Sequence, residues 1–87
     1  MSWSVGDRCE VGGKPGVVRF MGPTQFAPGD WVGVELDTAE GKNDGTCEGV
    51  PYFTCSPNHG VFVRPESLMA EAEAGPVQGR EGFKLFV

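Results

Sequence analysis

Turn-forming residues interrupt this chain so often that no long helix or strand fits between them. The sequence has 14 glycines and seven prolines in 87 residues, far above ordinary usage. They divide the chain about every eight to twelve residues, a spacing typical of short strands joined by tight turns. Apolar and polar residues alternate between them, so we expect strands at 8–11, 16–22, 31–36, 46–48, 50–54 and 61–64.

Five or six short strands predict an all-β fold, a small SH3-like barrel of twisted antiparallel strands with long glycine-rich loops. The hydrophobic content of 39% is enough for one core, and the length fits one domain. We place that domain at 4–68, with at best one helical turn at its end. Residues 69–87 are treated as a tail or linker, possibly part of a larger protein, and the apolar segment 83–87 has no assigned role.

Strict alternation along 16–22 would place Val18 and Phe20 on one face of their strand. Val17, Arg19 and Met21 would then lie on the other face. The adjacent Tyr52 and Phe53 cannot both point inward, so we assign Phe53 to the core and leave Tyr52 open.

Charge and hydropathy exclude some classes of partner. The net charge is −5, and a nucleic-acid-binding domain would need a basic face. No apolar run approaches the ~20 residues of a membrane span, and residues 1–11 lack a leader pattern. We therefore expect a cytoplasmic protein that binds neither nucleic acid nor membrane.

The three cysteines are expected to be free thiols in a reducing compartment, because their number is odd. A zinc site of Cys9, Cys47, Cys55 and His59 is the alternative, but the Cys-x-x-Cys knuckle that usually seeds such a site is missing. Cys55 and His59 also form the one local nucleophile–base pair, without an acid to orient it. We expect neither a cofactor nor catalysis.

Residues 41–45, Gly-Lys-Asn-Asp-Gly, have the composition of an anion-binding loop. Lys42 supplies charge, Asn43 supplies donors and an acceptor, and exposed backbone N–H groups could add more. The glycines Gly41 and Gly45 let the backbone bend sharply. Asn-Asp-Gly is also ordinary hairpin chemistry, so Asp44 is expected to cap the turn rather than to contact a ligand.

Three blocks of this sequence follow one another in order across residues 5–68: Thr24-x-Phe26-Ala27-x-Gly29-x-Trp31-Val32-Gly33-Val34-Glu35-Leu36-Asp37, then 41–45, then Tyr52-Phe53-x-Cys55 with 60–64. Together they resemble the CAP-Gly domain. The family occurs in dynactin's large subunit, cytoplasmic linker proteins, some kinesins and tubulin-folding cofactors. The resemblance implies a groove for acidic-aromatic C-terminal tails, those of α-tubulin and of end-binding proteins, and a place on the microtubule cytoskeleton.

The resemblance assigns the anion contact to Lys42 and Asn43 and an aromatic wall to Phe26, Trp31 and Phe62. Each aromatic could instead belong to the core, although Trp rings often bury one face and present the indole N–H to a ligand. Two further residues complete the expected site. Arg64 should share a face with Phe62 and add a second cation, unless it is a surface charge paired with Glu66. Gly33 lies within a strand, where glycine suggests a close approach of another group.

Two departures from the family pattern concern Cys47, where Val or Ile is common, and Pro51, where Lys or Arg is common. The loss of a positive charge at position 51 weakens the expected attraction for acidic tails. The alternative function is an SH3-like module that binds other linear peptides, such as proline-rich segments.

Overall fold

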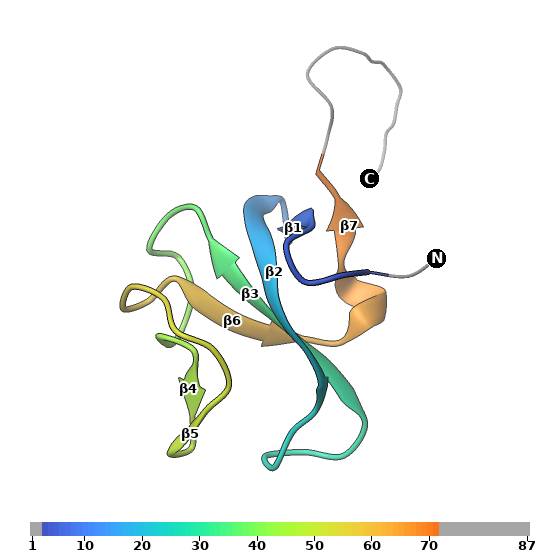
Figure 1. Ribbon diagram of the computed structural model, residues 1–87. Helices are drawn as coiled ribbons and strands as arrows, with labels where there is room; N and C mark the ends of the chain where they lie inside the picture. Colours follow the sequence, from blue (N-terminus) through green and yellow to red (C-terminus); the bar gives the residue numbers. More distant parts are fainter. Residues whose placement is uncertain (1–2, 72–87) are drawn as a thin grey trace.

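The computed structural model describes residues 3–71, and these form an all-β domain (Figure 1). In this part of the chain the non-strand element is a single 3-10 turn, Pro65–Ser67, and no helix is long and apolar enough to cross a membrane. The strands are β1 (Arg8–Val11), β2 (Lys14–Pro23), β3 (Asp30–Leu36), β4 (Thr46–Cys47), β5 (Val50–Pro51), β6 (Gly60–Val63) and β7 (Met69–Ala70).

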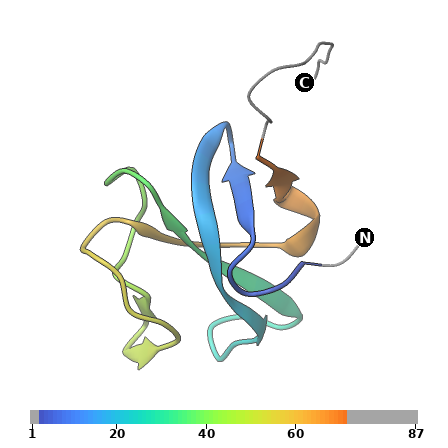
Figure 2. The ribbon, with the colours of Figure 1, turned by 45° about the horizontal axis from the view of Figure 1, so that its top comes forward.

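Five of these strands form one antiparallel sheet in the order β6-β3-β2-β1-β7, and β4 and β5 form a separate two-stranded ribbon. The long strands β2 and β3 are strongly twisted (Figures 1 and 2), and both views place the ribbon on the β6 side of the sheet, away from β1 and β7. The all-β antiparallel class is confirmed. The sheet keeps β6 and β7 as its two edges, so its hydrogen bonds do not close a complete ring.

The core lies on one face of this sheet and is aliphatic. Val18 on β2 pairs with Val34 on β3, and both side chains are fully buried. Trp3, Val11, Val61 and Val63 pack around the core as half-buried side chains. The buried core residues are Cys9, Val18, Val32, Val34, Leu36 and Leu68.

A register shift in β2 reverses the faces that simple alternation predicts. Val18 pairs with Val34, but Phe20 pairs with Gly33, because a β-bulge lies between Val18 and Phe20. Since β3 alternates regularly, Val34 and Gly33 point to opposite faces, and so do Val18 and Phe20. The expectation that Val18 and Phe20 share a face is therefore wrong. The bulge moves Phe20 out of the aliphatic core and onto the other face.

Gly33 is buried at the point where the bulge brings Phe20 across. A Cβ atom at Gly33 would collide with the Phe53 ring, lying 2.9 Å from its Cδ1, and would lie 3.1 Å from Cβ of Phe20. Both distances are shorter than ordinary carbon–carbon contacts. Glycine at this position therefore lets the Phe53 ring lie directly on the sheet.

The sheet extends two residues past the expected domain end at Leu68. Met69 and Ala70 pair with Glu10 and Cys9 of β1. The division into 4–68 and 69–87 stays a prediction, and the interpretation of the tail, including 83–87, concerns residues beyond those described.

Arg8 on β1 joins the segments that follow β3 and β7 through paired hydrogen bonds to the carboxylates of Asp37 and Glu71. Its guanidinium lies 2.7 Å from Oδ2 of Asp37 and 2.7 Å from Oε2 of Glu71. These bonds hold the pKa values of Asp37 and Glu71 below their ordinary values. The stabilisation is therefore present above the ordinary carboxyl pKa and is lost as the pH falls through the lowered values.

The three cysteines differ in environment. Cys9 is fully buried in the core, and burial raises the pKa of its thiol to about 11. Cys47 and Cys55 are half-buried, and burial also raises the pKa of Cys55. All three thiols are unpaired, and residues 3–71 contain no cluster of three or more cysteine, histidine or acidic side chains able to hold a metal.

Cys9 should resist alkylation in the folded protein. At pH 8 a thiol with a pKa near 11 is about one-thousandth ionised, and the thiolate is the reacting species. Mass spectrometry after iodoacetamide treatment should find label on Cys47 and Cys55 first. Cys9 should become labelled only in guanidinium chloride, and its labelling at the rate of Cys47 in native protein would contradict the buried position.

Gly33→Ser should destabilise the domain by about 1–3 kcal/mol, because the new side chain meets the Phe53 ring. Urea unfolding of a double-mutant cycle with Phe53→Ala measures this directly. The cost of Gly33→Ser should be smaller when the ring is absent. An equal cost in both backgrounds would show that the Phe53 ring is not the obstacle.

Candidate functional site

Six aromatic side chains gather on the sheet face opposite the aliphatic core, and we call this surface the aromatic face. The Phe26 ring lies 5.1 Å from Trp31 and 5.2 Å from Phe62, centroid to centroid. The rings meet edge to face or tilted, the geometry that aromatic quadrupoles favour. All are half-buried, so the face combines packing with accessible area. Its members are Phe20, Phe26, Trp31, Tyr52, Phe53 and Phe62.

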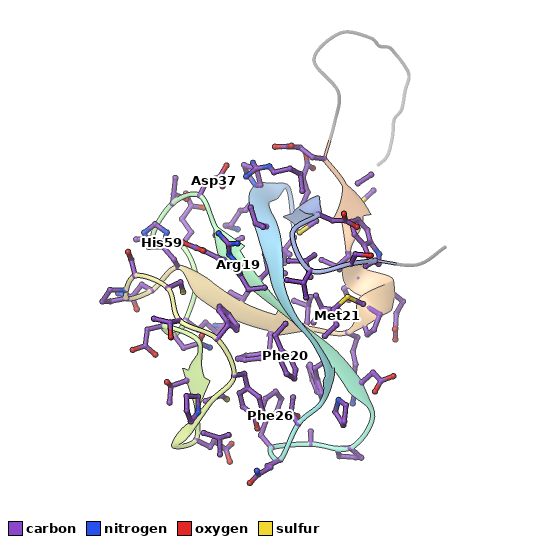
Figure 3. The ribbon with its side chains drawn as sticks, in the orientation of Figure 1. Arg19, Phe20, Met21, Phe26, Asp37 and His59 are labelled. Atoms are coloured by element: carbon purple, nitrogen blue, oxygen red, sulfur yellow. The ribbon has the colours of Figure 1, made fainter. Side chains whose placement is uncertain are left out.

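Three of these rings come from the sheet and three from the segments that cover it. Phe20, Trp31 and Phe62 belong to β2, β3 and β6, and the first and last of them flank Gly33 in the strand pairing. Phe26 lies on the loop between β2 and β3, whereas Tyr52 and Phe53 follow β5. Figure 3 shows Phe20 and Phe26 toward one end of the molecule, while Arg19, Asp37 and His59 lie toward the other.

The structure brings together the expected aromatic wall of Phe26, Trp31 and Phe62 and adds three residues that we did not predict for it, Phe20, Tyr52 and Phe53. Phe20 arrives through the bulge, which alternation does not reveal. Tyr52 lies 5.3 Å from Phe62, and its hydroxyl accepts a hydrogen bond of 2.9 Å from the Gln25 N–H. The sequence feature that pointed to Tyr52 was its place next to Phe53, since two adjacent residues of a strand point to opposite faces.

Phe53 is not a core residue, and that assignment is wrong. Its ring is half-buried, lies over Gly33 and packs 5.5 Å from Phe62 on the aromatic face. The missing side chain of Gly33 leaves room for this ring on the aromatic face, whereas the opposite face is filled by valine and leucine of the core.

The indole N–H of Trp31 is buried and has no hydrogen-bond partner among the described residues. It is therefore not presented at the surface as the sequence interpretation suggested. The guanidinium of Arg64 covers the Trp31 ring at 4.0 Å from its centroid. The alternative pairing of Arg64 with Glu66 does not occur, since the salt bridges within residues 3–71 include none between them.

The 41–45 loop is bound to the outer edge of β6. The N–H groups of Lys42 and Asn43 donate to the Gly60 carbonyl at 2.8 and 3.0 Å, and the Gly60 N–H donates to the Asn43 carbonyl at 2.8 Å. The Gly41 N–H donates to the Asn58 carbonyl at 2.6 Å. The N–H groups of Gly41, Lys42 and Asn43 are therefore already occupied within the protein and do not point to a ligand.

The side chains of this loop have different tasks. Asn43 Oδ1 accepts the Gly45 N–H at 2.9 Å, which leaves its NH₂ group without a partner within residues 3–71. Asp44 Oδ1 accepts the Thr46 N–H at 3.1 Å and so caps the turn. Lys42 is exposed, and its ammonium makes no ion pair with another described residue.

Glycines make this close attachment possible. A Cβ at Gly41 would lie 2.6 Å from the Gly60 carbonyl oxygen. Gly45 has a φ of +100°, and a Cβ there would collide with the backbone of Phe53. Its carbonyl accepts the Tyr52 N–H at 2.9 Å, so the loop is continuous with the segment that carries two of the rings.

Lys42 and Asn43 thereby lie on a loop attached to β6, the strand that carries Phe62. Asn43 forms a β-bridge with Gly60, and Phe62 follows two residues along the same strand. Residues at i and i+2 share a strand face and are about 6–7 Å apart. The loop that carries the unpaired Lys42 and the free amide of Asn43 therefore borders the strand that carries the half-buried ring of Phe62.

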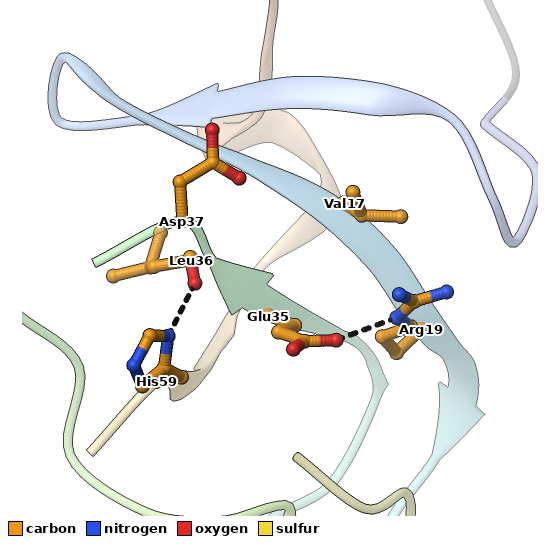
Figure 4. A pocket seen from close by; sticks show the side chains of 6 residues that line it. All are labelled: Val17, Arg19, Glu35, Leu36, Asp37 and His59. Atoms are coloured by element: carbon orange, nitrogen blue, oxygen red, sulfur yellow. Dashed lines mark hydrogen bonds and ion pairs between the residues drawn. The ribbon is translucent and has the colours of Figure 1, made fainter. Parts of the chain in front are cut away.

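A polar hollow of about 310 Å³ lies at the other end of β3, away from the aromatic face (Figure 4). Its charged groups are satisfied within the protein: Arg19 donates to Glu35 at 2.8 Å, and the His59 Nδ1 lies 2.8 Å from the Leu36 carbonyl oxygen. His59 belongs to a turn, as expected. The residues that line the hollow are Val17, Arg19, Glu35, Leu36, Asp37 and His59.

Known proteins share both the sequence and the fold. CAP-Gly domain-containing linker protein 3 of Mus musculus is 61% identical over 60 residues, which are 68% of this chain and 11% of the relative. The chain spans between 2% and 11% of the length of six curated relatives that it matches.

Two solved structures of other proteins are similar to this one. The solution structure of the CAP-Gly domain in human kinesin-like protein KIF13B has a TM-score of 0.75 and 46% identity, covering 88% of this chain and 77% of that one. The Bik1 CAP-Gly domain with the ETF peptide from Bim1 has a TM-score of 0.66 and 29% identity, covering 72% and 78%. The sequence profile of the CAP-Gly domain matches residues 5–68, and this chain belongs to the CAP-Gly domain family.

Proposed function

We propose that this domain is a non-catalytic module that binds C-terminal peptides with acidic residues and an aromatic side chain near the end. The observation that carries the proposal is the unpaired ammonium of Lys42 on a loop attached to β6 at Gly60, two residues before Phe62. A peptide carboxylate beside Lys42 would place the neighbouring aromatic side chain over the aromatic face.

The chemistry of the two parts is complementary. Covering the half-buried rings with an aromatic side chain favours binding by about 25 cal/mol for each Å² of apolar surface removed from water. Lys42 and the free NH₂ group of Asn43 can donate to carboxylate oxygens, and such charge-assisted hydrogen bonds contribute about 1.5–3 kcal/mol each. Neither part alone selects a ligand. Together they favour an anion that carries an aromatic group.

The similarity to Bik1 supports this ligand class. That CAP-Gly domain was solved with the ETF peptide from Bim1, whose letters denote Glu-Thr-Phe, an acidic and an aromatic residue. We propose the tails of α-tubulin and of end-binding-type proteins as partners of this chain, and the microtubule cytoskeleton as its place in the cell. The similarity to a linker protein supports this placement.

Binding should be moderate and local. The net charge of −5 repels acidic partners at long range, so affinity depends on contacts rather than on steering. Exposed Pro51 adds no charge where the family pattern often has one.

A peptide that ends in Glu-Glu-Tyr should bind with a Kd in the micromolar range, since these few contacts supply about 7–9 kcal/mol. Isothermal titration calorimetry should show that the affinity falls by about tenfold or more when the terminal carboxylate is amidated. Unchanged affinity of the amidated peptide would refute carboxylate capture. Tighter binding of a Pro-x-x-Pro peptide would favour the SH3-like alternative instead.

Lys42→Ala should weaken binding of the same peptide by about tenfold to a hundredfold, from the loss of one charge-assisted hydrogen bond. Its melting temperature should stay close to that of the parent protein, because the Lys42 side chain has no partner within residues 3–71. Lys14→Ala is the matched control with the same change in charge, and it should retain the parent affinity. Equal losses in both variants would indicate a general charge effect.

A further inference from the structure

We infer that Arg64 acts as a positioning residue, which holds the loop of residues 24–29 and the Trp31 ring in the shape that binds the peptide. This inference rests on the proposed function and revises the sequence expectation that Arg64 is a second cation for the ligand. The guanidinium binds groups of the protein itself and orders them in the ligand-free domain.

The contacts of Arg64 are directed at the loop backbone and at the Trp31 ring. Nη1 donates to the Pro28 carbonyl at 2.8 Å and reaches the Asp30 carbonyl at 3.3 Å. The guanidinium carbon lies 4.0 Å from the centroid of Trp31. One planar group therefore joins the end of the loop to the first residues of β3, and its position follows from β6, which pairs with β3 up to Val63.

Gly29 leaves the space that this arrangement needs. Its φ is +88°, and a Cβ there would lie 2.5 Å from Nη1 of Arg64. A side chain at position 29 would thus displace the guanidinium as well as strain the backbone. The loop conformation and the Arg64 contact depend on each other.

The opposite half of the loop is held separately. The Gln25 N–H donates to the Tyr52 hydroxyl at 2.9 Å. Phe26 lies between these two attachments, and its ring contacts both Trp31 and Phe62. Release of the Arg64 end would leave the Tyr52 hydrogen bond and the ring contacts of Phe26 to hold the loop between β2 and β3, and Phe26 would be less firmly fixed on the aromatic face. A ligand would then have to order the loop when it binds, which lowers affinity.

Lysine cannot replace arginine in this role, although it can replace it as a charge. An ammonium has no planar face to lie over Trp31 while its edge donates to the loop carbonyls, as the guanidinium does. The two roles therefore predict different results for Arg64→Lys. A ligand-contacting cation tolerates the change, whereas a positioning residue does not.

The experiment measures the Kd of the Glu-Glu-Tyr peptide by calorimetry at two salt concentrations for the parent protein and four variants: Arg64→Lys, Arg64→Met, Gly29→Ala and Gly49→Ala. We expect Arg64→Lys, Arg64→Met and Gly29→Ala each to lose about tenfold, with the salt dependence of the parent. Gly49→Ala is the matched control, because Gly49 has a φ of +83° and nothing within 4 Å of an added Cβ. It should bind like the parent.

Nuclear Overhauser contacts between the Phe26 and Trp31 rings, recorded without peptide, provide a second measurement. They should be present in the parent and in Gly49→Ala, and weakened in the three other variants, while thermal melts show that each variant is folded. Parent-like affinity of Arg64→Lys with a reduced salt dependence in Arg64→Met would overturn the inference in favour of a direct anion contact. So would unchanged ring contacts in all Arg64 variants. If the parent itself fails to bind the peptide, the proposed function falls, and the ring contacts still report whether Arg64 orders the loop.

Discussion

The register shift between Val18 and Phe20 gives the central sheet two different apolar faces, and the other features of the domain depend on it. On one face β2 and β3 contribute valine and leucine to a closed aliphatic core. On the other face β2 and β6 present Phe20 and Phe62 on either side of Gly33, where a ring from outside the sheet can lie. A regular strand would have left Phe20 among the aliphatic side chains, where a large ring would overpack the core.

Loops complete the aromatic face, and each is attached to the sheet at defined points. The 41–45 loop lies along β6 through the Gly60 backbone, and its continuation carries Tyr52 and Phe53 over the sheet. The 24–29 loop is held by Tyr52 and Arg64. A small domain thus presents half-buried rings beside a loop that carries a free cation, with little freedom left to lose on binding, which favours affinity from few contacts.

Much of this could be predicted from the sequence. Turn residues and alternation located the strands to within a few residues, and the motif pattern identified the family and the wall of Phe26, Trp31 and Phe62. What escaped prediction depends on tertiary geometry. The bulge that turns Phe20 over leaves no mark in the alternation, β7 forms through pairing with β1, and Phe53 fills a space visible only beside Gly33. Whether Arg64 meets solvent, Glu66 or the loop is decided by a strand pairing that the sequence does not reveal.

The central claim is that the aromatic face and the 41–45 loop together form one binding surface. The most direct measurement is a chemical-shift titration of the labelled domain with the Glu-Glu-Tyr peptide, observing backbone amides and aromatic side chains together. We expect the largest chemical-shift changes at Phe26, Trp31, Lys42, Asn43 and Phe62, and little change at Cys9 or along β1 and β7. Changes centred on the polar hollow around Arg19 and His59, with the aromatic face unaffected, would contradict it.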